Sequence, residues 1–271
     1  MQTENSLGQW PNAPLAYVVA ELTFQQVPGS SDKFGPFAEL LAEEYPIYSP
    51  TQMNVVTIGG NVQSETVTAS DLRDFDNVNG IRVTPTSMAV HTVAYRGWDA
   101  FRDQLAKALE ALKATVAPRV VARLALRYID LIVPAEGASV ADYLAPELRP
   151  WAPSDPKIGT LDQHNRVIVL KDQENRVVMA TSMDHIRVPM TLPPNLPAIP
   201  IKLSTMQQKA MKCYAENRAF GMLDVQATHE SAGRLDIPSI LESFRCLHDK
   251  QSALFNNMIS ERALREWKEE A

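Results

Sequence analysis

The fold is decided by residues 81–133, which read IRVTPTSMAVHTVAYRGWDAFRDQLAKALEALKATVAPRVVARLALRYIDLIV. Apolar and polar residues alternate from Ile81 to His91, as expected of a strand with one buried face. After Gly97, apolar residues recur at helical spacing over five turns. Pro118 ends this helix, and 120–133 is a long apolar run typical of a central strand buried on both faces. The stretch therefore predicts a β-α-β unit.

Three further elements precede this unit. Leu15–Phe24 is rich in β-branched and aromatic residues and predicts a strand. A helix follows, with Ser31 or Asp32 as its cap and an end before Pro46. Residues 53–69 predict a hairpin. Including the hairpin, the order is β-α-β-β-β-α-β. With the hairpin counted as one embellished strand, the order becomes β-α-β-β-α-β, the ferredoxin-like plan, in which two helices cover one face of an antiparallel sheet.

The second half predicts a further sheet-and-helix region. Residues 166–180 read as a hairpin with a polar loop, and Phe220–Ala227 as a strand, while 206–216 remain ambiguous. Asp236 and Pro238 favour the start of a long C-terminal helix, and Ser260 that of a short final one. We therefore predict an α+β protein with a ferredoxin-like domain at 1–134 and a second α+β region at 135–271, a candidate repeat of the first.

Composition limits the classes of function. The chain has 271 residues, 45% of them hydrophobic, and carries a net charge of −6 with a pI near 5.4. This acidic balance disfavours a broad nucleic-acid surface, because nonspecific affinity for phosphates comes from Lys and Arg. The sequence contains neither a long apolar run nor a basic, apolar leader, so we predict a cytoplasmic protein without membrane contact.

Motifs that carry chemistry are missing from the sequence. It contains no Gly-x-Ser-x-Gly elbow, Walker loop or Gly-x-Gly-x-x-Gly fingerprint. Cys213 and Cys246 form no Cys-x-x-Cys pair and predict free thiols. The Asp-x-Asp pattern around Asp74 lacks the Gly and terminal Glu of a calcium loop. We therefore expect Asp71, Asp74 and Asp76 to lie in a solvated turn. We therefore predict no catalytic set, no metal site and no cofactor.

Four residues are candidates for ligand binding: Arg127, Tyr128, Asp224 and His248. An arginine inside an apolar strand needs an anion, because an unpaired buried charge is very costly. Its partner is either a structural carboxylate such as Asp224, which we favour, or an anionic ligand. His248 lies on the apolar side of a helix and favours a structural role. Asp184-His185 and Thr228-His229-Glu230 have no recognised ligand spacing and favour solvated loops.

Short motifs along most of the chain resemble a sporadically distributed prokaryotic family of uncharacterised proteins of similar length. They are Pro14-Leu15-Ala16-Tyr17-Val18, Glu44-Tyr45-Pro46, Gly97-Trp98 with Phe101, Leu126-Arg127-Tyr128-Ile129, Leu223-Asp224-Val225, Leu247-His248 and Phe255. The resemblance implies no assigned activity or cofactor. The scattered occurrence of the family resembles that of genes in mobile or defence-related neighbourhoods.

Three hypotheses on function follow. The first is a non-enzymatic binding or interaction protein with a protein partner, either a neighbouring gene product in a defence or accessory system or a second copy of the chain. The second is an RNA-binding or RNA-processing protein built on tandem ferredoxin-like domains, which the acidic pI disfavours. The third is an enzyme that uses His248 with Arg127. The absence of catalytic motifs favours the first.

Overall fold

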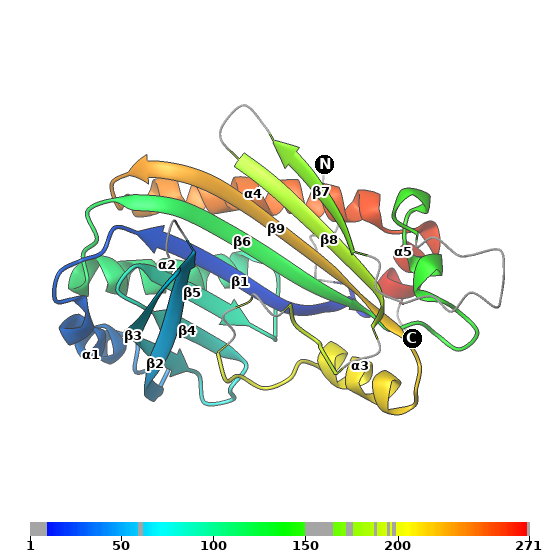
Figure 1. Cartoon of the computed structure of the whole chain (residues 1–271), viewed down its shortest axis with the longest axis horizontal. Coiled ribbons are helices and arrows are strands. Elements are labelled where there is room, and N and C mark those ends of the chain that lie inside the picture. Colours follow the sequence, from blue (N-terminus) through cyan, green and yellow to red (C-terminus); the bar gives the residue numbers. More distant parts are fainter. Residues whose placement is uncertain are drawn as a thin grey trace.

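The computed structural model describes residues 10–58, 62–149, 165–171, 176–186, 189–193, 196 and 199–269. These residues form an antiparallel sheet in the order β2-β3-β4-β5-β1-β6-β9-β8-β7 (Figure 1). Its strands are β1 (Leu15–Phe24), β2 (Ile47–Ile58), β3 (Val62–Arg73), β4 (Asn79–Val83), β5 (Ser87–Thr92), β6 (Val121–Ile132), β7 (Asn165–Lys171), β8 (Arg176–Ile186) and β9 (Phe220–Gly233).

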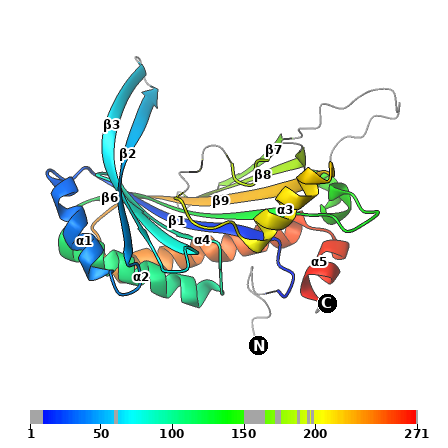
Figure 2. The same cartoon turned by 90° about the horizontal axis from the view of Figure 1, so that it is seen from below.

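Helices cover the two faces of this sheet unequally. They are α1 (Phe34–Leu40), α2 (Trp98–Thr115), α3 (Thr205–Ala215), α4 (Ile237–Met258) and α5 (Glu261–Lys268), with 3-10 turns at Ser30–Lys33, Val140–Tyr143 and Pro146–Leu148. On what we call the first face, α1, α2, α4 and α5 pack over side chains such as Val18 and Tyr128. Figure 2 shows α2 and α4 together on this side. The α+β class with an antiparallel sheet is confirmed.

The second face of the sheet carries α3. Ala210 and Cys213 of this helix pack against Ile129, Leu131 and Met222, whose side chains point away from the first face. The prediction of helices on one face therefore holds for the other four helices and needs correction for α3. A long run of small and apolar residues facing α3 explains the difference, because β6 is buried on both sides.

The two halves of the chain share one sheet. Without the β2–β3 hairpin, the first half runs β1, α1, β4, β5, α2, β6, and β1 lies between β5 and β6. The boundary predicted at residue 134 follows β6, which pairs with β9 from Val121 to Ile132. Described elements of the second half run β7, β8, α3, β9, α4, α5, an order that differs from the first half.

The single strand predicted for Ile81–His91 is wrong, because this stretch is the hairpin β4–β5. Thr84 makes the turn: its hydroxyl oxygen accepts hydrogen bonds from the backbone N–H groups of Thr86 and Ser87. Pro85 lies inside the turn and has no N–H to offer a strand neighbour. Local hydrogen bonding by Thr84 therefore overrides the alternating pattern.

Two helix starts predicted in the second half are confirmed, and the ambiguous segment is a helix. Ser204 and Gln207 form a capping box that begins α3 and settles the ambiguous segment as helix. The side chains of Asp236 and Ser260 cap α4 and α5 as expected. No helix in the described part of the chain has both the length and the apolar character needed to cross a membrane.

Gln251 ties α4 to the junction between the two halves. Its side chain is fully buried, and its Nε2 donates to the carbonyl oxygens of Leu126 in β6 and Val225 in β9, at 2.8 and 2.7 Å. One carboxamide thus holds the helix over two paired strands. A buried polar group keeps its place only through such hydrogen bonds.

We expect Gln251→Met to lower the free energy of unfolding by about 1–2 kcal/mol, because methionine fills a similar volume but cannot donate to the two carbonyls. Urea unfolding of the purified chain measures the change. Asn256→Met, on the exposed side of the same helix, is the control and should leave stability close to that of the parent. Equal stability of Gln251→Met and the parent would show that the clamp is dispensable.

Candidate functional site

The sheet separates the four predicted ligand-binding residues into two pairs. Tyr128 and His248 lie on the first face, where Tyr128 is part of the main core. Arg127 and Asp224 lie on the second face, beside Ile129 and Met222 in the alternation of β6 and β9. The four residues do not form one site, because adjacent residues of a strand point to opposite faces.

Arg127 and Asp224 form a two-pronged ion pair. Arg127 Nε donates to Asp224 Oδ1 at 2.7 Å, and Nη2 donates to Oδ2 at 2.5 Å. The side chains are 8% and 10% exposed. The predicted structural pairing is confirmed, and it satisfies the charge that an apolar strand could not otherwise hold.

His248 is held by two aromatic residues. The Tyr128 hydroxyl lies 2.9 Å from His248 Nδ1, and the imidazole stacks on Trp98 with centroids 4.8 Å apart. Gly97 makes this possible, because its φ of 106° lets the chain turn sharply into α2 and places Trp98 at its first position. Burial lowers the pKa of His248 to about 4, although Asp249 and Asp99 oppose the shift.

At neutral pH this imidazole is therefore uncharged, and only 4% of the residue is exposed. A general base needs hydrogen-bond reach to its substrate, which a shielded, stacked ring lacks. The Tyr128 hydroxyl also contacts Tyr95 Oη at 3.2 Å. The arrangement supports the structural role expected of His248.

A second polar cluster on the second face was missed at the sequence level. Arg82 and Asp71 face each other in the β3–β4 ladder and form an ion pair, with Nε–Oδ1 at 2.6 Å and Nη2–Oδ2 at 2.7 Å. Beside it, the Tyr17 hydroxyl lies 2.7 Å from His91 Nδ1. Burial, with a smaller contribution from Arg82, lowers the pKa of His91 to about 3.

This cluster corrects the solvated-turn prediction for Asp71, which lies buried in β3. Asp74 does belong to a turn, where Oδ1 accepts from the N–H groups of Val78 and Asn79. The available signal was Arg82, which interrupts an apolar strand as Arg127 does. A buried arginine needs a carboxylate nearby. The sequence did not show which carboxylate this is, because the pairing register of β3 and β4 decides it.

Three of the arginines described on this face are paired with carboxylates, whereas Arg73 donates to Asn77, Pro200 O and Ser49. Arg123 donates to Glu21 at 3.2 Å, a half-exposed pair that joins the two buried ones at Arg82 and Arg127. Paired charges leave little net positive potential for a phosphate backbone. Arg82, Arg123 and Arg127 are therefore not free to neutralise a phosphate backbone.

Asp130 is a buried carboxyl group in the main core. Asp130 lies in β6, opposite Leu15 of β1 and Leu223 of β9, and its side chain points to the first face. Neither carboxyl oxygen has a hydrogen-bond partner among the described residues. Burial, and to a lesser extent the charge of Asp224, raises the pKa of Asp130 from 3.8 to about 8. The group is therefore mostly protonated at neutral pH.

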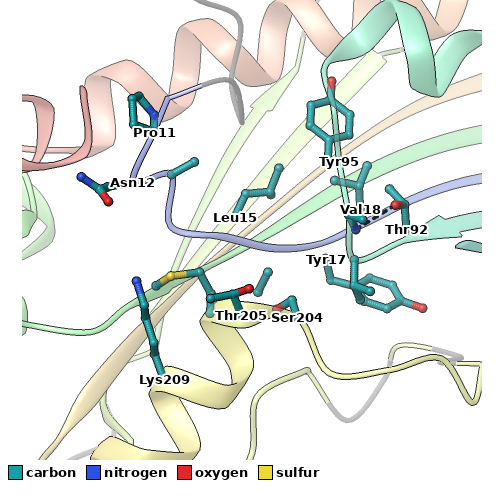
Figure 3. A pocket seen from close by; sticks show the side chains of 15 residues that line it. Pro11, Asn12, Leu15, Tyr17, Val18, Thr92, Tyr95, Ser204, Thr205 and Lys209 are labelled. Carbon is teal, nitrogen blue, oxygen red and sulfur yellow. Dashed lines mark hydrogen bonds between the residues drawn. The ribbon is translucent and has the colours of Figure 1, made fainter. Parts of the chain in front are cut away.

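A cavity lies between β1, the end of β5 and the first turn of α3 (Figure 3). It has a volume of about 250 Å³, and Asn12, Thr92, Ser204 and Lys209 contribute polar groups to its wall. Among the described residues, no buried polar atom of the wall lacks a partner. The cavity therefore offers no unmet hydrogen-bonding demand to a ligand.

The other candidates from the sequence do not assemble. His229 lies in β9, on the face opposite to Arg127, and the side chains of Asp184 and His185 lie outside the described residues. Within the described ranges, no group of three His, Cys, Asp or Glu side chains is placed to hold a metal ion. Cys213 and Cys246 are free thiols, as predicted.

No family model matches the chain, and no curated protein matches its sequence. The resemblance to a sporadic prokaryotic family therefore stays a prediction.

We expect Arg127→Met to lower the free energy of unfolding by about 3–5 kcal/mol, because it leaves the Asp224 carboxylate buried without its partner. The double variant Arg127→Met/Asp224→Leu should regain most of this loss. Arg123→Met is the matched control on the same strand, and loss of its half-exposed pair should cost less than about 1 kcal/mol. A stable Arg127→Met chain would contradict the structural role.

We expect Asp130→Asn to change how stability depends on pH. With a folded pKa of about 8 and an unfolded value near 3.8, the Asp130 carboxyl makes its full contribution to stability below pH 4, and this contribution is lost as pH rises towards 8. The variant cannot ionise, so its advantage should grow by up to about 1.4 kcal/mol per pH unit between these values. Urea unfolding at pH 5, 6 and 7 measures it, and parallel pH profiles would contradict the assignment.

Proposed function

We propose that this chain is a non-catalytic protein-binding module that engages a partner protein through the β2–β3 hairpin. One observation carries the proposal. The ladder between β2 and β3 runs from Ile47↔Arg73 to Ile58↔Val62, but only Ser70–Arg73 of β3 pair with β4. The eight pairs from Thr51↔Ala69 to Ile58↔Val62 therefore extend beyond the sheet.

We call these two segments, Thr51–Ile58 and Val62–Ala69, the ribbon. Figure 2 shows it rising from the sheet, away from α1 and α2. At roughly 3.4 Å per residue it is about 27 Å long. An isolated pair of strands is marginally stable in water, and a third strand or a packed face stabilises it. A partner protein that adds a strand to the β2 edge meets this need.

The amino-acid sequence of the ribbon suits protein contact better than contact with nucleic acid. Glu65 is the single charged residue in its sixteen positions. Edge strands that avoid association usually carry Lys, inward charges or bulges, and the ribbon sequence contains no Lys or Arg. Pro50 interrupts β2 just before the ribbon, so the sheet edge is blocked next to the body and open along the ribbon.

Two alternatives have weaker support. RNA binding requires unpaired basic groups, whereas Arg82, Arg123 and Arg127 each have a carboxylate partner. An enzyme that uses His248 with Arg127 requires both groups at one substrate, but they lie on opposite faces of the sheet.

The test is a chain with a shortened ribbon. Residues 54–66 are replaced by Asn-Gly, which joins Met53 and Val67, already opposite each other in the ladder, through a two-residue turn. We expect this variant to keep the melting temperature of the parent, because the deleted part pairs with no other strand. A protein that co-purifies with the parent from its native host should be lost.

The recovered protein is then produced separately, and its affinity for each variant is measured by calorimetry. Phe75→Ser is the control, because Phe75 is 84% exposed in the neighbouring β3–β4 turn and is the competing apolar contact. We expect Phe75→Ser to bind as the parent does and the shortened chain to bind at least about a hundredfold more weakly. Undiminished binding by a folded, shortened chain would overturn the proposal.

A further inference from the structure

A polar groove lies on the first face, between the first half of α2 and the β4–β5 hairpin. It consists of two cavities of about 160 and 330 Å³ that share Asn79, Ala100 and Gln104 in their walls. The larger one extends to Tyr45, which precedes β2, and to Asp74, which follows the end of β3. Neither the ribbon nor the His248 cluster contributes to the larger cavity.

Two oxygen atoms in the shared wall lack hydrogen bonds. Asn79 Oδ1 and Gln104 Oε1 are buried and have no partner among the described residues. The orientation of Asn79 is fixed, because its Nδ2 donates to Asp74 Oδ2 at 2.7 Å and a flipped amide would bring two oxygens together. Buried acceptors in native proteins are nearly always bonded, so these two point to a donor that fills the groove.

The charge around the larger cavity is negative. Glu44, Asp74 and Asp103 line it together with one cation, Lys107, which is already hydrogen-bonded to Glu44. The negative charge around this cavity affects the buried Tyr45 hydroxyl. Its pKa is raised above the usual 10, mainly by burial, with further contributions from Asp74 and Glu44. A positively charged donor is therefore favoured over a neutral one.

We propose that this groove binds a small organic cation through a primary ammonium group, which donates to Asn79 Oδ1 and Gln104 Oε1 beside the Asp74 carboxylate. An ammonium group has three N–H donors and no acceptor, which matches a wall whose unmet groups are all acceptors. Charge-assisted bonds of this type are about twice as strong as neutral ones. This site is independent of the proposed ribbon contact.

The test is calorimetry with two cations of the same kind of charge and different hydrogen-bonding capacity. Putrescine carries primary ammonium groups, whereas choline has a quaternary nitrogen without N–H. At low ionic strength, we expect saturable binding of putrescine at one site per chain. The affinity for choline should be lower by a factor of about ten or more. Equal affinity for both cations, or no putrescine binding at millimolar concentration, would overturn the proposal.

Two variants of one residue locate the site. Gln104→Met removes one acceptor and should weaken putrescine binding about tenfold or more, whereas Gln104→Glu adds a carboxylate and should strengthen it. Gln208→Met, on the exposed side of α3, is the matched control and should bind as the parent does. Thermal unfolding verifies that each variant is folded. Parent-like affinity of both Gln104 variants would place putrescine elsewhere and overturn the proposal.

Discussion

Burial of β6 on both faces is the constraint on which the rest of the structure depends. A strand in that position has no solvent for its polar side chains, so each one must find a partner inside the protein. Arg127 finds Asp224 on the second face, and Tyr128 finds His248 on the first. Asp130 has no such partner among the described residues and stays neutral instead, because its pKa is raised to about 8.

The same strand explains why the two halves of the chain share one sheet. β9 pairs along β6, and the carboxamide of Gln251 bonds a carbonyl of each strand. A second connection crosses the other face. Pro200 O accepts from Arg73, Lys202 N donates to Asn77 O, and Ile199 occupies the space where a side chain at Gly80 would lie. The Arg73 side chain, the Asn77 carbonyl and the space above Gly80 thus hold the segment that leads into α3.

From the sequence, helices and strands could be predicted more reliably than the residues and strands that they contact. Helical spacing after Gly97 and the apolar run of β6 are local signals, and both elements were predicted correctly. The need of Arg127 for a carboxylate followed from burial alone, and Asp224 was a correct choice. The turn at Thr84 was missed because one hydroxyl decides it. Asp71 was missed because its burial depends on a register opposite Arg82, which no local pattern encodes.

These internal pairings also explain why both proposed binding sites lie at the periphery of the molecule. The ionisable groups that looked reactive in the sequence, Arg127 and His248, are occupied by neighbours and shielded from solvent. At the margin of the sheet, the outer part of the ribbon pairs with no third strand, and Asn79 Oδ1 lacks a hydrogen-bond partner in the wall of the groove. Both proposals therefore concern the margin of the first half, where the ribbon, the β3–β4 turn and α2 lie, and not the paired charges of the core.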